Sequence, residues 1–470
     1  MRFEHDFLGQ VELPDEVYYG VQTWRASQNF AITGHRLCPE FITALATIKK
    51  AAAKANMKTG RMPEAVGEAI VQAADEIIAG KLHDQFIVDA IQGGAGTSMN
   101  MNANEVIANR ALELLGKAKG DYEVVSPNNQ VNMAQSTNDV MPTAIRIASI
   151  QKTKLLISEL ETLHHGLRQK SEQFQHVLKM GRTHLQDAVP ITLGQEFAAY
   201  ADTVKRSIKR ISRAMDNLFT VNMGATAVGT GLNAEPEYIK EVVRQLSILT
   251  GNTMVSASNL VDATQNTDEL AELSGALKVC ALSLSKIAND LRMMASGPKC
   301  GLSELILPAM QPGSSIMPGK INPVIPEVLN QVAFQVIGND QAIGLAVEAG
   351  QFELNVMEPV IAYNLFNSLT FLTNAVRTLQ QRCIAGIEAN EARCRELLDS
   401  SVGVITALLP HIGYEAASAI AKEALRTKEP VKDIILRQGL MTADQLNVIL
   451  SPAEMTKPGI AGKQYIKKIS

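Results

Sequence analysis

The sequence is poor in aromatic residues and cysteines, and both scarcities narrow the possible folds. Aromatic residues make up 4% of the 470 residues, whereas hydrophobic residues together make up 46%. The core must therefore consist mainly of Ala, Leu, Ile, Val and Met side chains, which favours closely packed helices over a β-sandwich. The five cysteines are scattered and form no CxxC pair: Cys38, Cys280, Cys300, Cys383 and Cys394. This spacing argues against a disulfide framework or a zinc site, and it fits a reducing cytosol.

Motifs for membranes, nucleic acid, nucleotides and metals are also missing. No stretch approaches the roughly 18 uninterrupted apolar residues of a membrane span, and the first residues lack the apolar run of a signal peptide. A membrane is therefore not an expected partner. The net charge is −4 without a dense Lys/Arg run, so nucleic acid is not an expected partner either. No P-loop or HExxH motif occurs, and Met99 occupies the third glycine position of a GxGxxG pattern. We therefore expect a cytoplasmic protein with no cofactor and no metal.

Long stretches without proline predict long helices. Five runs are each long enough for one or two helices, at residues 143–189, 191–235, 237–297, 327–358 and 360–409. In the first run, apolar residues recur mostly at steps of three or four: Leu156, Leu160, Leu163, Leu167, Phe174 and Leu178. This stripe is typical of a bundle of long helices. The run at 327–358 is poor in charge and predicts a helix buried on most sides, as at a subunit contact.

The expected fold is all-α for the most part, and the chain divides into three regions. Residues 1–137 mix short helical patterns with Gly- and Asn-rich loops, residues 138–392 hold the long helices, and residues 393–470 form a small helical unit. Within the last region, Thr442 and Gln445 have the spacing of a capping box ahead of Leu446.

Four polar segments interrupt the apolar helical sequence. They are QGGAGTSMNMN (92–102), NMAQSTND (132–139), GRTHLQD (181–187) and GSSIMPGKINP (313–323). Each alone is more often explained by helix caps and turns, and His184 alone would more often be a structural histidine. Together, without a metal or nucleotide motif, they indicate a small polar ligand. Hydroxyls and free N–H groups at helix N-termini hold carboxylates well, and Lys320 adds a positive charge.

These segments resemble those of a known family. The aspartase/fumarase superfamily has a signature loop that resembles GSSIMPGKINP and further active-site segments that resemble GRTHLQDAVP, QGGAGTSMNMNANEV and QSTND. The motifs occur in the right order along nearly the whole chain. The resemblance implies three mostly helical domains, a bundle formed by the long helices of four subunits, and active sites each assembled from three subunits. The interruption at Gly313 would then supply a mobile lid.

Within the superfamily the chain looks most like the aspartases. Its start, DFLGQVELPDEVYYGVQT, resembles the aspartase N-terminus, where fumarases typically have tryptophan in place of Tyr19. Fumarases also carry TGSGT where this chain has QGGAGTS, NPTQxEA where it has INPVIPEVLNQ, and Phe-Lys where it has Met357-Glu358. One departure from the family is Leu409-Pro410, which is often Asn-Pro.

The resemblance also implies a reaction and the residues that perform it. Aspartases remove the amino group and a β-proton from L-aspartate, which gives fumarate and ammonia through an enediolate with two negative oxygens. The implied ligands of the β-carboxylate are Thr97, Ser136, Thr137 and Ser315. Those of the α-carboxylate are Lys320 and Asn322, with Thr183 close by, and those of the amino group are Asn138 and His184. The implied flexible loop comprises Gly313, Ile316, Met317, Pro318 and Gly319.

The base is the least direct of these assignments. The superfamily pattern implies Ser314, although a serine hydroxyl is normally far too weak an acid to ionise. Its alkoxide requires a stabilising local field, which consecutive backbone N–H groups of the loop could supply, whereas His184 is the more conventional base. Two other functions stay open: a fumarase, which uses the same loops on malate, and a helical oligomer without activity. The complete polar set favours an active enzyme, and the apolar stripes with dispersed site segments favour a homotetramer.

Overall fold

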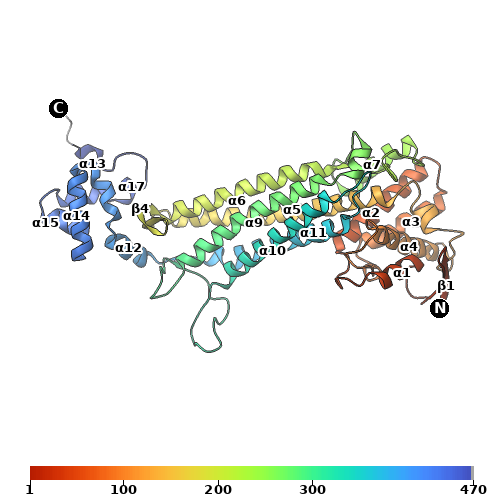
Figure 1. Ribbon diagram of the computed structural model, residues 1–470, viewed down its shortest axis with the longest axis horizontal. Coiled ribbons are helices and arrows are strands. Elements are labelled where there is room, and N and C mark those ends of the chain that lie inside the picture. The colour runs from red at the N-terminus through yellow and green to blue at the C-terminus, as the bar shows by residue number, and fades with distance from the viewer. Residues whose placement is uncertain (467–470) are drawn as a thin grey trace. The chain divides into compact units, whose positions relative to one another are not determined.

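The computed structural model describes residues 1–466, and most of them are helical (Figure 1). The chain divides into two compact units. Unit 1 comprises residues 1–158, 207–281 and 333–373, and unit 2 comprises residues 159–206, 282–332 and 374–470, of which 467–470 lie outside the described part. The predicted all-α fold with long helices is confirmed. The three-region division at residues 137 and 392 stays a prediction, and its last four residues, 467–470, are among those not described.

Unit 1 holds the N-terminal helices. Its short elements are the antiparallel pair β1 (Arg2–Asp6) and β2 (Gly9–Leu13), the parallel pair β5 (Thr220–Val221) and β6 (Val255–Ser256), and helices α1 (Val21–Asn29), α2 (Pro39–Lys58), α3 (Glu64–Ile78), α4 (Thr97–Leu114), α7 (Pro236–Thr250) and α8 (Leu260–Gln265). Helix α2 packs against α3, α4 and α7. Because α2 is rich in alanine and buried along most of its length, its neighbours can approach closely.

The longest helices of the described chain contribute residues to both units. They are α5 (Thr137–Gln173), α6 (Leu193–Asp216), α9 (Asp268–Met294), α10 (Val324–Glu348) and α11 (Glu358–Arg382). Within unit 1, Arg146 of α5 donates to Glu269 of α9 at 2.9 Å, and Asn339 of α10 donates to Ser368 of α11 at 3.0 Å. Within unit 2, Asn330 of α10 donates to Ser285 of α9 at 2.8 Å. Buried polar bonds of this kind fix which helices are neighbours.

The apolar stripe predicted for the first long helix is confirmed. Its members on α5 are all buried: Leu156, Leu160, Leu163 and Leu167. Phe174, directly after the end of α5, is buried as well. However, α5 begins at Thr137 and passes through Pro142, although the proline-free run starts only at residue 143. Pro142 has no N–H for the carbonyl of Asn138 one turn earlier. The buried side chain of Asn222 donates to that carbonyl at 3.0 Å, so the oxygen keeps a partner.

A β-hairpin follows α5, where the proline-free run predicted more helix. This prediction was wrong: β3 (Leu178–Thr183) pairs with β4 (Gln186–Thr192) in an antiparallel hairpin with a register shift between Met180 and Arg182. The polar segment at 181–187 therefore forms the tip of a hairpin. Leu178 continues the spacing of the helical stripe by coincidence, because its side chain instead packs with the C-terminal helices of unit 2.

The C-terminal part of unit 2 is a cluster of short helices. Its elements are the antiparallel pair β7 (Leu305–Ile306) and β8 (Glu388–Ala389), and α12 (Glu391–Ser400), α13 (Leu409–Ile412), α14 (Tyr414–Thr427), α15 (Val431–Arg437), α16 (Ala443–Ile449) and α17 (Pro452–Met455). The predicted capping box at the start of α16 is confirmed, since Thr442 and Gln445 exchange side-chain and backbone bonds. Leu446 and Ile449 share a core with Leu178 and Met180 of β3. The hairpin is thus anchored by the C-terminal helices.

Helix α10 corresponds to the charge-poor run, and part of its surface is exposed in the single chain. Its burial at a subunit contact stays a prediction. In the single chain, the exposed fraction is 64% for Phe334 and 63% for Leu345. Leu329, Ala333, and Val336 on its other face are buried. The low charge of α10 therefore marks an apolar surface, not a helix enclosed within one chain.

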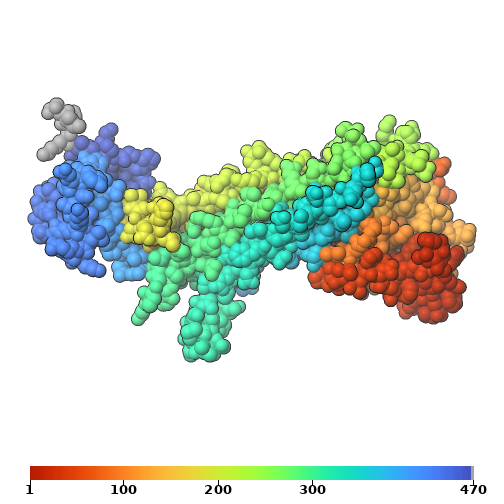
Figure 2. Space-filling model, in the orientation of Figure 1, coloured from red at the N-terminus to blue at the C-terminus, as the bar shows by residue number. Residues whose placement is uncertain are grey.

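The loop before α10 stands out from the helices as a lobe (Figure 2). It carries the segment 313–322, most of whose residues are exposed.

Within residues 1–466, no helix combines the length and the apolar character needed to cross a membrane.

The bond from Asn222 to the carbonyl of Asn138 can be tested with a double-mutant cycle. We expect Asn222→Leu to lower the free energy of unfolding by about 1–3 kcal/mol, because a buried carbonyl loses its donor. The loss should be smaller in a Pro142→Ala background, since the new N–H of residue 142 can bond to the same carbonyl. Melting curves of the four proteins give the coupling. Equal losses in both backgrounds would show that this bond does not support the helix.

Candidate active site

Two of the predicted polar segments place hydroxyls at helix N-termini in unit 1. Thr97 is the first residue of α4 and follows Gly96, whose φ of 83° is left-handed. The Thr97 hydroxyl donates to the carbonyl of Gly94 at 2.7 Å. Ser136 precedes α5, and its Oγ accepts a bond from the N–H of Asn138 at 3.2 Å. Each segment therefore places a hydroxyl at the positive end of a helix dipole, which is a favourable place for a carboxylate.

A buried carboxylate holds the first turn of α5. Asp139 Oδ1 accepts from the N–H of Ser136 at 2.9 Å, and Oδ2 accepts from those of Gly224 and Thr226 at 3.0 and 3.1 Å. Burial raises the pKa of Asp139 to about 6, whereas these backbone bonds act in the opposite direction. Asp139 thus ties the start of α5 to the loop that follows β5.

The two helix ends of unit 1 are joined by an amide. Asn100, one turn into α4, donates from Nδ2 to Thr137 Oγ1 at 3.4 Å, and its Oδ1 accepts from Lys49 Nζ at 2.7 Å. Lys49 lies on α2 with no exposed surface, and it also donates to Asn132 and Gln135 at 2.9 Å. Lys49 belongs to none of the predicted site segments. The sequence does hold one indication of its burial, because Lys49 lies on the same helical face as the buried residues of the alanine-rich α2.

Asn138 has a side chain with one end fixed. Its Nδ2 donates to the carbonyl of Ala227 at 2.7 Å. Because this bond fixes which way the amide points, Oδ1 is the end directed away from Ala227. Among residues 1–466, no hydrogen bond involves that oxygen, so Asn138 can accept a hydrogen bond from an ammonium group.

Thr183 and His184 occupy the tip of the β3–β4 hairpin in unit 2. His184 and Leu185 have φ values of 55° and 60°, which is the backbone of a two-residue hairpin turn. Both predicted site residues are exposed there. Behind the tip, Arg182 bonds to both oxygens of the fully buried Glu304 at 2.9 and 3.0 Å. This ion pair fixes the strand that carries Thr183.

The segment 313–322 is a loop that is closed at its base. The N–H of Gly313 donates to the carbonyl of Lys320 at 2.7 Å, and Asn322 Nδ2 donates to the carbonyl of Gly313 at 2.7 Å. A Cβ on residue 313 would lie only 2.6 Å from the Lys320 oxygen. Glycine is therefore required for this close approach. The mobility expected of the loop stays a prediction.

Within the loop, Ser314 is half-buried and its Oγ accepts two backbone bonds. The donors are the N–H groups of Ile316 and Met317, at 3.2 and 3.1 Å. Two N–H groups that converge on one oxygen stabilise negative charge on it. Ser315 and Lys320 are exposed. Polar groups suited to a carboxylate are thus concentrated on this loop.

The predicted residues fall into two groups, one in each unit. The unit 1 group comprises Thr97, Ser136, Thr137 and Asn138, and the unit 2 group comprises Thr183, His184, Ser314, Ser315, Lys320 and Asn322. The contacts described above link residues within each group. Within residues 1–466, no cluster of three or more His, Cys, Asp or Glu side chains is arranged to hold a metal ion.

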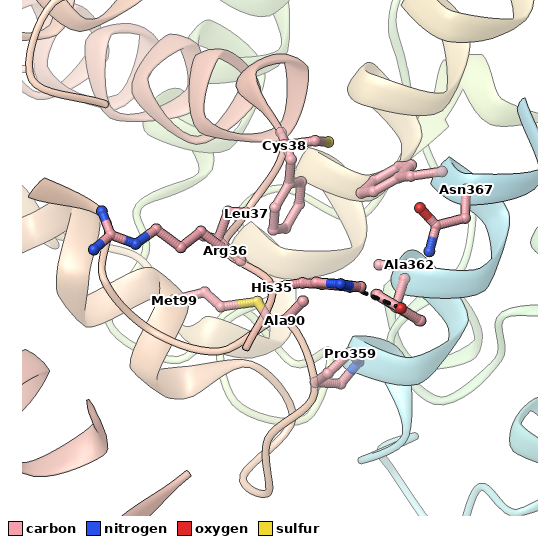
Figure 3. A pocket seen from close by; sticks show the side chains of 12 residues that line it. His35, Arg36, Leu37, Cys38, Ala90, Met99, Pro359, Ala362 and Asn367 are labelled. Atoms are coloured by element: carbon pink, nitrogen blue, oxygen red, sulfur yellow. Dashed lines mark hydrogen bonds between the residues drawn. The ribbon is translucent and has the colours of Figure 1, made fainter. Parts of the chain in front are cut away.

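One pocket of unit 1, which is open to solvent, contains none of the predicted residues. Its volume is about 240 Å³, and its lining includes His35, Met99, Tyr363 and Phe366 (Figure 3). His35 Nδ1 and the Tyr363 hydroxyl are hydrogen-bonded at 2.9 Å. The lining is mainly apolar, so this pocket does not suit a dicarboxylate.

Two protein families match most of the chain. Residues 9–338 match the lyase family, and residues 404–457 match the fumarase C C-terminus family. The chain belongs to the aspartase/fumarase superfamily. The resemblance of the polar segments to this superfamily is therefore confirmed. All four segments lie within residues 9–338, which match the lyase family.

Several superfamily members with the name aspartate ammonia-lyase are similar to the whole chain. The Bacillus subtilis protein is 60% identical, covering 99% of this chain and 98% of its own. The Helicobacter pylori protein is 52% identical, covering 97% and 98%, and the Escherichia coli protein is 47% identical, covering 99% and 98%. The match therefore includes every predicted site segment.

Solved structures of the superfamily share the fold. A Brucella melitensis protein named fumarate lyase:delta crystallin has a TM-score of 0.95 at 48% identity, covering 97% of this chain and 100% of its own. A class II fumarase from Schistosoma mansoni has a TM-score of 0.93 at 35% identity, covering 97% and 99%. The same backbone thus occurs in superfamily members with different names.

The closed base of the 313–322 loop predicts a strong effect of one methyl group. We expect Gly313→Ala to break the two bonds at the base, because its Cβ meets the Lys320 carbonyl. Backbone amides of the loop should then exchange about tenfold faster with deuterium, as for the loss of one to two hydrogen bonds. Gly319→Asn is the matched control, since Gly319 is left-handed and a Cβ there meets nothing within 4 Å. If both variants exchange at the wild-type rate, the base is not held by these bonds.

Proposed function

We propose that this protein is an aspartate ammonia-lyase, a carbon–nitrogen lyase that converts L-aspartate reversibly into fumarate and ammonia. The observation that carries the proposal is the 47–60% identity, over nearly the whole chain, to proteins of that name. The polar residues required for a dicarboxylate occur within the matched region. The rest of the proposal assigns roles to them.

The chemical demand of the reaction is to stabilise a dianionic carboxylate. Removal of the β-proton moves charge onto the β-carboxylate, which becomes an enediolate. Donors fixed in advance and aimed at that charge can each contribute roughly 3 to 4 kcal/mol to the rate. We assign this task to the hydroxyls of Thr97, Ser136, Thr137 and Ser315. The N-termini of α4 and α5 support the assignment, because their dipoles favour negative charge.

The remaining substrate groups need a cation and an acceptor. Lys320 and Asn322 are assigned to the α-carboxylate, with Thr183 close by, since an ammonium makes charge-assisted bonds to a carboxylate. Asn138 and His184 are assigned to the amino group. The orientation of Asn138 supports this role, because the bond from its Nδ2 to Ala227 leaves Oδ1 as the end that can accept from an ammonium.

Ser314 is assigned as the base that takes the β-proton. The two backbone N–H groups at its Oγ support this role, because they would lower the cost of an alkoxide there. Closure of the loop over substrate would remove water and strengthen these bonds. His184 is the alternative base, since histidine is the side chain that most often acts as a general base.

The proposal includes a homotetramer in the cytoplasm, with active sites shared between subunits. The exposed Phe334 and Leu345 on charge-poor α10 support association, because apolar surface of this kind is normally covered. L-Aspartate, fumarate and ammonia are its small-molecule partners.

The substrate can be established with purified protein. We expect L-aspartate to give fumarate, seen as growing ultraviolet absorbance, together with an equal amount of ammonia. L-Malate should give much less fumarate. A site that binds two substrate carboxylates and also offers an acceptor to an ammonium group rejects a substrate without the charged amino group. Comparable turnover of malate would assign the protein as a fumarase instead. No turnover of either compound would favour a helical oligomer without activity.

The base can be identified by comparing two variants. We expect Ser314→Ala to lower kcat by about 10²- to 10⁴-fold with little change in substrate binding, because a general base contributes about that factor. His184→Ala should keep measurable turnover and raise KM for L-aspartate, because His184 is assigned to binding. Steady-state kinetics and light scattering, which checks the assembly, provide the data. An active Ser314→Ala protein with an inactive His184→Ala protein that still binds substrate would exchange the two roles.

A further inference from the structure

Lys49 is a fully buried lysine whose hydrogen-bond partners among residues 1–466 are all side-chain amide oxygens. Its Nζ lies 2.7 Å from Asn100 Oδ1, 2.9 Å from Asn132 Oδ1 and 2.9 Å from Gln135 Oε1. No salt bridge to Lys49 occurs among residues 1–466. An ammonium has three donors and no acceptor. The three amide oxygens therefore saturate it, and each must turn its oxygen toward Lys49.

The orientation of these amides determines where their N–H groups point. With its oxygen on Lys49, Asn100 directs Nδ2 to Thr137 Oγ1 at 3.4 Å and to Asn132 Oδ1 at 3.2 Å. Asn132 Nδ2 donates to the carbonyl of Gln135 at 3.2 Å. The chain Lys49–Asn100–Thr137 thus has a single direction of donation.

That direction matters at Thr137. A hydroxyl has one proton to donate, and Thr137 Oγ1 already accepts from Asn100. Its own proton is therefore free to point away from Asn100. A carboxylate only accepts hydrogen bonds, so it needs the hydroxyl proton pointed toward it. If Asn100 were turned over, Thr137 would donate to its oxygen and have no proton for a carboxylate.

We propose that Lys49 is a positioning residue that, through Asn100, turns the Thr137 hydroxyl into a dedicated donor to the substrate carboxylate. This inference rests on the proposed function and on the assignment of Thr137 to the β-carboxylate. Lys49 does not touch the substrate. It acts on the direction of a hydrogen bond two groups away.

This role requires the ammonium form of Lys49, which burial disfavours and the nearby buried carboxylate of Asp139 favours. Burial lowers the pKa of Lys49 to about 7, and the carboxylate of Asp139 opposes that shift without contacting the ammonium. Asp139 bonds to backbone N–H groups at the start of α5, whereas Lys49 bonds to side chains of α4 and the loop before α5. The first turn of α5 therefore lies between a buried cation and a buried anion. A neutral residue at position 49 would leave Asp139 as the only charge at this turn.

A double-mutant cycle tests the link between Lys49 and Thr137. The readout is the Kd for succinate, a four-carbon dicarboxylate that cannot react, measured by calorimetry. We expect Lys49→Met and Thr137→Val each to raise this Kd about tenfold, the effect of losing one hydrogen bond to a charged group. In the Thr137→Val background, Lys49→Met should change the Kd less than about twofold, because the hydroxyl it orients is gone. Lys50→Met is the matched control, since Lys50 pairs with Asp75 at the surface.

A second variant tests the same link with the ammonium in place. Lys49→Met leaves three buried oxygens without their donor and lowers stability. Asn100→Asp keeps the side-chain shape and the bond to Lys49 but removes the N–H directed at Thr137. We expect it to raise the succinate Kd about tenfold in the wild type and far less in Thr137→Val. A repulsive effect of the added charge alone would persist in both backgrounds.

Two results would overturn the inference. One is an increase in Kd for Lys49→Met or Asn100→Asp that is as large in Thr137→Val as in the wild type. The other is a Thr137→Val protein that binds succinate as tightly as the wild type. Both are separate from failure of the proposed function, which is judged by wild-type turnover of L-aspartate. Melting curves identify any variant whose Kd reflects unfolding.

Discussion

The first turn of α5 is the constraint on which the candidate site depends. It carries Thr137 and Asn138, and Ser136 directly precedes it. The buried carboxylate of Asp139 fixes the backbone of this turn by accepting from the N–H groups of Ser136, Gly224 and Thr226. Without that buried carboxylate, the N–H groups of two segments would lack partners, at a cost of about 1–3 kcal/mol for each group. The position of three assigned substrate ligands thus follows from one side chain.

Pro142 lies inside α5 and affects the hydrogen bonds of this first turn. A proline inside a helix frees one carbonyl, which here is that of Asn138. The side chain of Asn222 donates to that carbonyl instead. The loop after β5 therefore contacts the first turn of α5 twice, through Asn222 and through the N–H of Gly224, which bonds to Asp139. In unit 2, backbone geometry also determines the shape of a site segment. There, Gly313 permits a close approach that closes the base of the loop around Ser314.

Much of this organisation could be predicted from the sequence, because it depends on local patterns. The stripe of Leu156 and Leu160 indicated α5, and the spacing of Thr442 and Gln445 indicated the cap of α16. The polar segments were found because their composition is unusual between apolar helices. Their assignment to substrate groups comes from the superfamily resemblance, and the individual roles await measurement.

Features that depend on distant contacts could not be predicted. The hairpin at residues 178–192 was read as helix, because Leu178 and Met180 are buried by C-terminal residues far away in the sequence. Lys49 was missed because its partners lie on α4 and in the loop before α5. The low charge of α10 indicated an apolar surface, but periodicity alone cannot say whether that surface is covered within one chain.

The most direct measurement of the central claim is a crystal structure of the protein with bound succinate. The account predicts one carboxylate at the N-terminus of α5, with an oxygen within about 3.2 Å of Thr137 Oγ1 and Asn100 still donating to that hydroxyl. The same carboxylate should lie near Thr97 at the start of α4. A succinate bound elsewhere, for example in the pocket beside His35 and Tyr363, with no contact to α5, would contradict the account.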